Sequence, residues 1–96
     1  MYSDEVNRKA REQMRVQRVV RILGKEKIVT RQGLMAELGL KKEGIRNFRV
    51  NYWYPSRDAG YVVMVFAGSP NCPDQAYKLT SKGRAYLEEL ENRNLE

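Results

Sequence analysis

The chain has 96 residues, with 18 Lys and Arg against 12 Asp and Glu, a net charge of +6 and 42% hydrophobic residues. This size and composition are typical of one globular domain and exclude a disordered chain. There is no histidine and only one cysteine, Cys72, so a histidine-based nucleophile, a zinc site and an internal disulfide are excluded. Glycine motifs that bind phosphates or dinucleotides are absent, and we expect neither an enzyme nor a need for a cofactor or metal.

The longest apolar run, residues 61–67, is far shorter than the roughly 20 residues that span a bilayer. The polar N-terminus lacks the apolar segment of a signal peptide. With a single cysteine, this predicts a cytoplasmic protein without a membrane contact. We expect one domain over residues 1–96, with residues 1–8 and 93–96 frayed and residues 95–96 left from a cloning site.

The first predicted element is a helix from about residue 6 to residue 23, closed by Gly24. Val16, Val19, Val20 and Leu23 have the spacing of one buried stripe. A second stripe beside it carries Arg8, Arg11, Arg15 and Arg18. Residues 1–50 hold 13 basic and 6 acidic side chains, whereas residues 51–96 hold 5 and 6. Such asymmetry is typical of a polyanion-binding face, although a solvated helix surface explains it equally well.

A strand stub at residues 28–29 precedes a short helix over residues 31–38, for which Thr30 is a good N-cap. Gly39 suits the left-handed position after a helix, and Leu40 can supply the apolar contact of a Schellman turn. A second helix should begin at Lys41 or Lys42 and run to about residue 54. Pro55 should end it, because the residue before a proline is disfavoured in the helical region. Two helices joined by a short turn with a glycine form a helix-turn-helix.

Residues 61–67 are rich in β-branched and aromatic side chains and predict a strand. Residues 68–74 contain two prolines and a glycine and predict a loop, followed by a return strand over 75–79. Thr80 or Ser81 should cap a last helix with a wet face of glutamates. The predicted core comprises Val16, Val19, Leu23, Leu34, Leu38, Ile45, Phe48, Leu79 and Leu87.

In this order the elements resemble a winged helix-turn-helix DNA-binding domain. Residues 30–40, followed by Ile45, resemble the second helix, the turn and the start of the recognition helix. Residues 77–87 (YKLTSKGRAYL) resemble the second wing strand and last helix of MarR- and PadR-type transcriptional regulators. The resemblance implies an α+β fold: a winged helix with a three-helix core, a β-hairpin wing and a C-terminal helix.

The angular positions in the helix before Pro55 separate two faces. Ile45, Phe48 and Tyr52 fall on the core side, and Trp53 lies at an edge. The opposite side and its flank hold the candidate DNA base contacts, which are Arg46, Asn47, Val50, Asn51 and Tyr54. Asparagine can pair with an adenine edge and arginine with guanine, while valine or a tyrosine ring can meet a thymine methyl. The alternative is that Val50 and Tyr54 pack under the hairpin or a partner subunit.

The candidate phosphate contacts are Lys41, Lys42, Arg49, Arg15 and Arg18. Lysines at 41–42 stand where the family usually has a Ser or Thr cap, so the first turn should be irregular, and Gly44 weakens it further. The wing loop contains no Lys or Arg, and we do not expect it to contact DNA. Strand 61–67 is apolar on both faces, which predicts that a helix of the chain or another protomer covers its second face.

We therefore predict sequence-specific binding of double-stranded DNA by a small transcriptional regulator, without a small-molecule ligand. It should act as a homodimer, in which the arginines of the first helix of one chain meet Glu88, Glu89 or Glu91 of the other. The same charge match can form within one chain. Two other functions stay open: a winged-helix protein-protein interaction module without specific DNA binding, and a DNA architectural factor.

Overall fold

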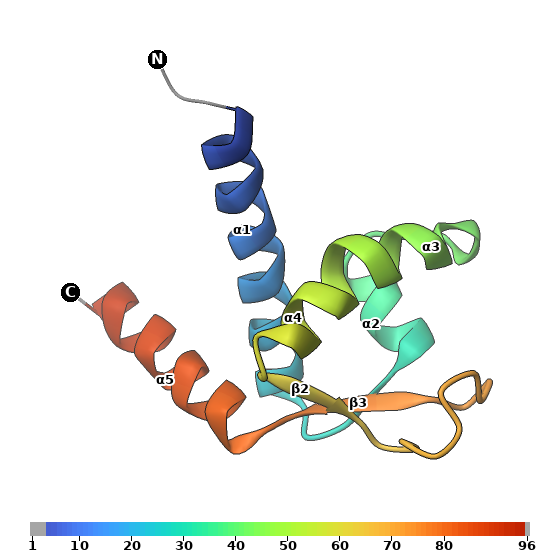
Figure 1. Cartoon of the computed structure of the whole chain (residues 1–96). Helices are drawn as coiled ribbons and strands as arrows, with labels where there is room; N and C mark the ends of the chain where they lie inside the picture. The colour runs from blue at the N-terminus through green and yellow to red at the C-terminus, as the bar shows by residue number, and fades with distance from the viewer. Residues whose placement is uncertain (1–3, 96) are drawn as a thin grey trace.

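The computed structural model describes residues 4–95, which form helices and one small sheet (Figure 1). In chain order these are α1 (Asp4–Lys25), β1 (Val29–Thr30), α2 (Arg31–Glu37), the 3₁₀ turn η1 (Lys42–Gly44), α3 (Ile45–Phe48), the π-helical segment η2 (Arg49–Trp53), α4 (Tyr54–Asp58), β2 (Val62–Met64), β3 (Ala76–Leu79) and α5 (Ser81–Leu95). Because α3, η2 and α4 follow one another without a break, they form one helix over residues 45–58, called the α3–α4 helix below. The α+β class is confirmed.

The chain ends of the described part are helical. Residues 4–8 belong to α1 and residues 93–95 to α5, and the expected fraying of these helix ends stays a prediction. The remaining part of that expectation, residues 1–3 and 96, lies outside the described residues, as does the second residue of the suspected cloning scar. No helix within residues 4–95 is long and apolar enough to cross a bilayer.

The sheet is antiparallel with the strand order β1-β3-β2. Val29 and Met64 both pair with Tyr77, and Val62 pairs with Leu79. Alternate side chains of the strands point toward the helices, and on this face Val29, Val62, Tyr77 and Leu79 are all buried. The sheet therefore closes the core from the side opposite the α3–α4 helix (Figure 1).

Strand β2 is much shorter than the predicted strand over residues 61–67. Its ladder with β3 ends where the amide of Val65 donates to the carbonyl of Ala76, at 2.8 Å. Beyond this hydrogen bond, the fully buried side chain of Gln75 provides the hydrogen-bond partners. Gln75 Oε1 accepts from the amide of Phe66, and Gln75 Nε2 donates to the carbonyls of Phe66 and Ser69, all at 3.0 Å. A side chain thus replaces the backbone partner that would have continued the strand.

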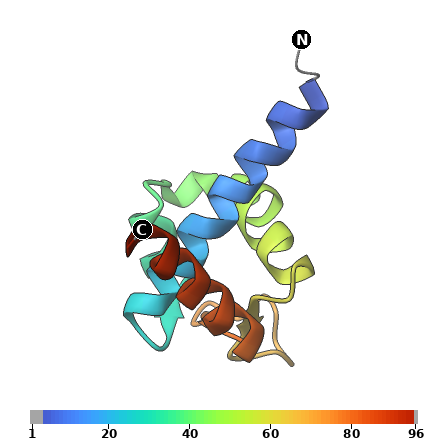
Figure 2. The same cartoon turned by 90° about the vertical axis from the view of Figure 1, so that its left-hand side faces the viewer.

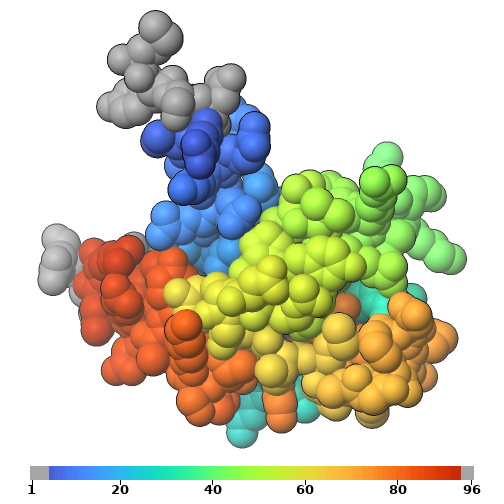
Figure 3. Space-filling model, in the orientation of Figure 1, coloured from blue at the N-terminus to red at the C-terminus, as the bar shows by residue number. Residues whose placement is uncertain are grey.

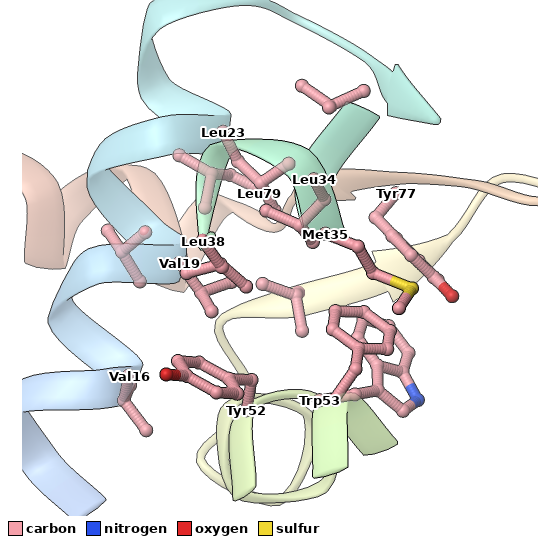
Figure 4. Packing of buried hydrophobic residues seen from close by; sticks show 14 of the residues in the cluster. Val16, Val19, Leu23, Leu34, Met35, Leu38, Tyr52, Trp53, Tyr77 and Leu79 are labelled. Atoms are coloured by element: carbon pink, nitrogen blue, oxygen red, sulfur yellow. The ribbon is translucent and has the colours of Figure 1, made fainter. Parts of the chain in front are cut away.

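The core lies between α1, α2, the α3–α4 helix and the sheet (Figure 4). Of the nine predicted core residues, seven are buried, and Ile45 and Leu87 are half-buried against them. The aromatic residues contribute more than predicted: the Tyr77 ring lies 4.4 Å from that of Trp53 and 5.8 Å from that of Phe48. Val20 and Tyr52, which the helical spacing placed on the buried side, are buried as well, and the further buried residues are Val29, Met35, Trp53, Val62, Ala76, Tyr77 and Leu90.

Candidate nucleic-acid interface

The turn that leads into the α3–α4 helix is built as the sequence predicts. Thr30 Oγ1 accepts a hydrogen bond from the amide of Gly33 at 3.1 Å and so caps α2. At the other end Gly39 has φ +76°, and the amide of Leu40 donates to the carbonyl of Met35 at 2.9 Å. This is the hydrogen bond of a Schellman turn. It turns the chain toward Lys41, where the next helix begins.

The first turn of that helix is irregular, as predicted. Lys41 occupies the N-cap position and makes no capping hydrogen bond through its side chain. Lys42 and Gly44 follow in the 3₁₀ conformation. Lys41 and Lys42 are both exposed, so two of the predicted phosphate contacts lie at the free N-terminal end of the α3–α4 helix.

The helix does not end before Pro55, which corrects the prediction. Proline has no amide hydrogen, so in a regular helix the carbonyl of Asn51, four residues earlier, would lose its donor. Arg15 of α1 supplies one instead: its Nε donates to the Asn51 carbonyl at 3.0 Å. Ser56 Oγ donates to the carbonyl of Tyr52 at 2.7 Å. With these two side-chain donors, the chain continues as a helix to Asp58.

The π-helical segment changes which side chains point inward. The amide of Tyr54 donates to the carbonyl of Arg49, five residues earlier. A π segment inserts an extra residue into the helical path, and here both Tyr52 and Trp53 are buried. Trp53 was expected at the edge of the helix; it belongs to the core. The angular prediction assumed an unbroken α-helix and fails for this residue only.

The five predicted base contacts gather on one surface of the α3–α4 helix, called the outer face. Its members are Arg46, Asn47, Val50, Asn51 and Tyr54. Val50 is 51% exposed and Tyr54 39%, and Arg46 and Asn47 are also exposed. Asn51 is half-buried, and its Nδ2 donates to Asn47 Oδ1 at 2.5 Å. The alternative that Val50 and Tyr54 pack under the hairpin is therefore wrong.

Arg57 extends this surface and was not anticipated. Its guanidinium lies over the ring of Tyr54, 4.7 Å from the ring centre. Arg57 follows Tyr54 by three residues, a spacing that places two side chains side by side on a helix. This contact was missed because the helix was expected to end before Pro55. Arg57 also forms an exposed ion pair with Asp58.

The three remaining predicted phosphate contacts differ in their surroundings. Arg18 is exposed on α1. Arg15 is half-buried and engaged with the Asn51 carbonyl. Arg49 is half-buried on the side of the helix toward Tyr77, and its charge opposes a shift of the Tyr77 pKa. Burial is the larger effect and raises the pKa of Tyr77 above 10.0, although Arg31 and Arg49 both act to lower it.

The hairpin loop between β2 and β3 is fastened to the domain by Arg31. The Arg31 Nη2 atom donates to the carbonyls of Cys72 at 2.9 Å and Pro70 at 3.3 Å. The loop holds no basic side chain, and its one charge is that of Asp74. No cation of the loop therefore extends the basic surface of the α3–α4 helix.

The second face of β2 is open. Val63 is 39% exposed and Phe66 47%, and Ile28, just before β1, is 54% exposed. Among residues 4–95, no helix covers these three side chains. The expectation that a helix of the same chain packs there is wrong, because α1 and α5 pack against each other instead (Figure 2).

Helices α1 and α5 pack together within one chain. The side chain of Leu87 fills the space beside Gly24, where a Cβ atom would clash. Leu90 is buried, and the Tyr86 ring stacks on Tyr61 at 4.4 Å. The apolar stripe of α5 is thus used internally. Ion pairs among the described side chains join Lys9 to Glu5, Arg57 to Asp58 and Arg93 to Glu89, and none links α1 to α5.

Residues 14–80 match the family model described as the C-terminal domain of filamentation induced by cAMP protein Fic-like. This stretch covers most of the chain, from the middle of α1 to the end of β3. The chain belongs to the Fic-like C-terminal domain family. Within residues 4–95, no group of His, Cys, Asp and Glu side chains could hold a metal ion.

A solved structure supports the membership of this Fic-like C-terminal domain. A Fic family protein from Desulfovibrio desulfuricans G20 is similar to the chain with a TM-score of 0.61 and 26% sequence identity. The similarity covers 84% of this chain and 21% of that protein, so the chain spans about a fifth of its structural relative. No curated protein matches.

These findings overturn the resemblance to MarR- and PadR-type regulators. The residues in 77–87 on which the resemblance rested are explained by local requirements of the backbone. Thr80 Oγ1 accepts from the amide of Gly83 at 2.9 Å and donates to the carbonyl of Gly60 at 2.6 Å. Gly83 is required because a Cβ there would collide with the carbonyl of Tyr61. Any strand that runs into a capped helix beside another backbone selects such residues, so the motif does not identify a family.

Proposed function

We propose that this Fic-like C-terminal domain is a winged helix that binds double-stranded DNA with sequence preference. In this proposal the α3–α4 helix is the recognition helix and the β2–β3 hairpin is the wing. The single observation that carries it is the composition of the outer face: two asparagines, an arginine, a valine and a tyrosine are held together on an exposed surface. No carboxylate occurs from Ile45 to Arg57.

The outer face has the chemistry for reading base edges. An asparagine amide offers a donor and an acceptor to adenine, and an arginine offers two donors to guanine. The bond from Asn51 to Asn47 fixes the orientation of both amides and leaves Asn51 Oδ1 as an acceptor, and the Asn47 amide group with the second N–H of Asn51 as donors, for a base. Val50 and Tyr54 present apolar surface that suits a thymine methyl group.

Basic residues around the outer face suit the phosphate backbone. Lys41 and Lys42 stand at the N-terminal end of the helix, where the helix dipole also favours an anion. Arg57 lies over the ring of Tyr54, Arg49 is half-buried on the same helix, and Arg18 is exposed on α1. Since the loop of the hairpin holds no cation, binding should depend on the helix rather than on the wing.

Titration of a labelled duplex at two salt concentrations tests the proposal. Wild-type protein should lose affinity steeply with salt, because each neutralised phosphate releases counterions. Asn47→Ala should change the preference at one base position by about 1–3 kcal/mol. Lys42→Ala should weaken binding to all sequences alike. Asn92→Ala and Lys27→Ala, at exposed sites away from the outer face, are the matched controls and should match wild type. A wild-type protein that binds no duplex would refute the proposal.

The proposal includes a role in transcriptional regulation by a homodimer. One recognition helix reads only a few base pairs, and two copies would read half-sites about one helical turn apart. Because Tyr86 and Leu90 are used within the chain, the pairing of α1 with α5 across a dimer rests on charge: Arg21 and Lys25 against Glu88 and Glu91. Sedimentation at tens of micromolar protein should give twice the 11.2 kDa mass of the chain, and a monomer would exclude the dimer.

A second candidate is a protein-protein interaction module without specific DNA binding. The open sheet face with Ile28, Val63 and Phe66 favours it, because such apolar side chains are common at protein interfaces. One comparison of variants distinguishes the two candidate functions. Val63→Ser with Phe66→Ser should leave DNA affinity unchanged if DNA is the partner of the outer face, and the outer-face variants should leave a protein complex intact if the sheet is the binding surface.

A further inference from the structure

The first half of α1 extends beyond the rest of the domain. Residues 5–14 are all exposed, whereas Val16, Val19, Val20 and Leu23 in the second half are buried. Figures 1 and 2 show these first turns reaching past every other element. At 1.5 Å per residue the whole helix is about 33 Å long, so it accounts for most of the 43 Å length of the domain. Residues 5–14 are called the arm below.

One side of α1 carries arginines at helical spacing. Arg8, Arg11 and Arg15, with Asn7, line a shallow hollow on the surface of the helix. Among the described side chains no ion pair uses these arginines, while Glu5 of the arm is already paired with Lys9 at 3.7 Å. Glu12, exposed beside Arg8, is the carboxylate next to this surface. Like charges at these helical spacings repel one another, and an anion bound between them would relieve the repulsion.

Arg15 shows which way this arginine surface faces. Its Nε bonds to the Asn51 carbonyl on the α3–α4 helix, so the surface turns toward that helix. Helix α5 packs on a different side of α1, where Leu87 lies against Gly24. Figure 3 shows the open angle between the arm and the α3–α4 helix. The arm forms one wall of this angle, and the outer face with Asn47 and Asn51 adjoins it.

We propose that Arg8 and Arg11 of the arm bind the phosphate backbone of the same DNA duplex whose major groove receives the α3–α4 helix. This inference rests on the proposed function. The major groove is about 12 Å wide and is bordered by two backbones, so a helix that rises from the edge of the recognition helix meets one of them. Arginine suits this place because its planar fork can donate two hydrogen bonds to one phosphate.

The arm lies largely outside the family match, which begins at residue 14. Arg8 and Arg11 therefore add a contact that the matched segment by itself does not contain. As a backbone contact, it should raise affinity for every sequence and leave base preference to the outer face.

The test compares full-length variants in anisotropy titrations with a duplex of about 20 base pairs, between about 50 and 200 mM salt. The arm variant is Arg8→Ala with Arg11→Ala, both exposed positions. Its matched control is Lys27→Ala with Lys78→Ala, which removes the same charge from exposed sites away from the arm and the outer face. Arg8→Lys with Arg11→Lys keeps the charge. Unfolding curves of all variants should coincide, because none of these side chains is buried.

The arm variant should bind about ten- to a hundredfold more weakly than wild type, and the slope of log affinity against log salt should become smaller by about 2. The ratio of its affinity for the preferred sequence to its affinity for a random sequence should stay unchanged. The lysine variant should keep most of the slope, and the control should match wild type. Glu12→Gln should strengthen binding.

Two results would overturn the inference while sparing the proposed function. The arm variant could behave like its control although Asn47→Ala still alters base preference, or it could itself alter base preference. Equal competition by poly-glutamate and by an unlabelled duplex would also overturn it, because the arginines would then recognise acidic protein as well as phosphate. A wild-type protein that binds no duplex would end both proposals together.

Discussion

Arg15 donates a hydrogen bond from its Nε to the backbone carbonyl of Asn51, 3.0 Å away on another helix. That carbonyl lacks its usual partner because the residue four positions later is Pro55. One side chain of α1 thereby allows the α3–α4 helix to continue and holds it at a fixed place beside α1. The position of Asn51, a candidate base contact, depends on this bond.

Replacing Arg15 by Ala should lower the free energy of unfolding by about 1–3 kcal/mol, the cost of a half-buried carbonyl left without a donor. In a Pro55→Ala background, the new amide at residue 55 can serve the Asn51 carbonyl. There the same Arg15→Ala substitution should cost less than half as much. A double-mutant cycle by urea unfolding measures this coupling. Equal costs in both backgrounds would show that the bond does not compensate for the proline.

Replacing Phe48 by Ala should cost about 3–5 kcal/mol, since the ring is fully buried and its removal leaves a cavity. In a domain of this size, that loss approaches the total stability. Circular dichroism during thermal unfolding measures it. Val50→Ala, on the same helix but half exposed, is the control and should change stability by less than about 0.5 kcal/mol.

Replacing Gln75 by Leu should loosen the hairpin loop. The substitution keeps the size of the side chain but removes its amide, so the amide of Phe66 loses its acceptor and the carbonyls of Phe66 and Ser69 lose their donor, at about 1–3 kcal/mol for each group left buried without a partner. Limited proteolysis should then cut within residues 65–74 at protease levels that spare wild type. Asn71→Ala, exposed in the same loop, should leave the cleavage pattern unchanged.

Stability should fall in alkaline solution. Burial raises the pKa of Tyr77 above its ordinary 10.0, so the folded protein keeps this proton at pH values where the unfolded chain loses it. The contribution is fully present below pH 10 and is lost as the pH rises through the pKa of the folded state. Tyr61, whose pKa is also raised, mainly by burial and also by Tyr86 and Glu89, acts in the same direction. Unfolding free energies between about pH 8 and 11 should decline less in Tyr77→Phe than in wild type; an equal decline would remove Tyr77 as a cause.

The sequence by itself determined the local structure. Thr30 and Gly39 specify the start and end of α2 because a hydroxyl cap and a positive φ are properties of single residues and their neighbours. The core side of α1 follows from periodicity in the same way. The register that buries Phe48 and exposes Asn47 was also correct, so the outer face was predictable from the angles of one helix.

Only the tertiary structure decided how these pieces are completed. The helix passes Pro55 because a donor 36 residues away satisfies the Asn51 carbonyl, and Trp53 turns inward because a π segment adds a residue to the helical path. Strand β2 stops early because the Gln75 side chain takes the place of a backbone partner. The direction of the α1 arginines toward the outer face likewise depends on how two helices pack. Each of these outcomes rests on a contact between residues distant in the chain, which no local propensity encodes.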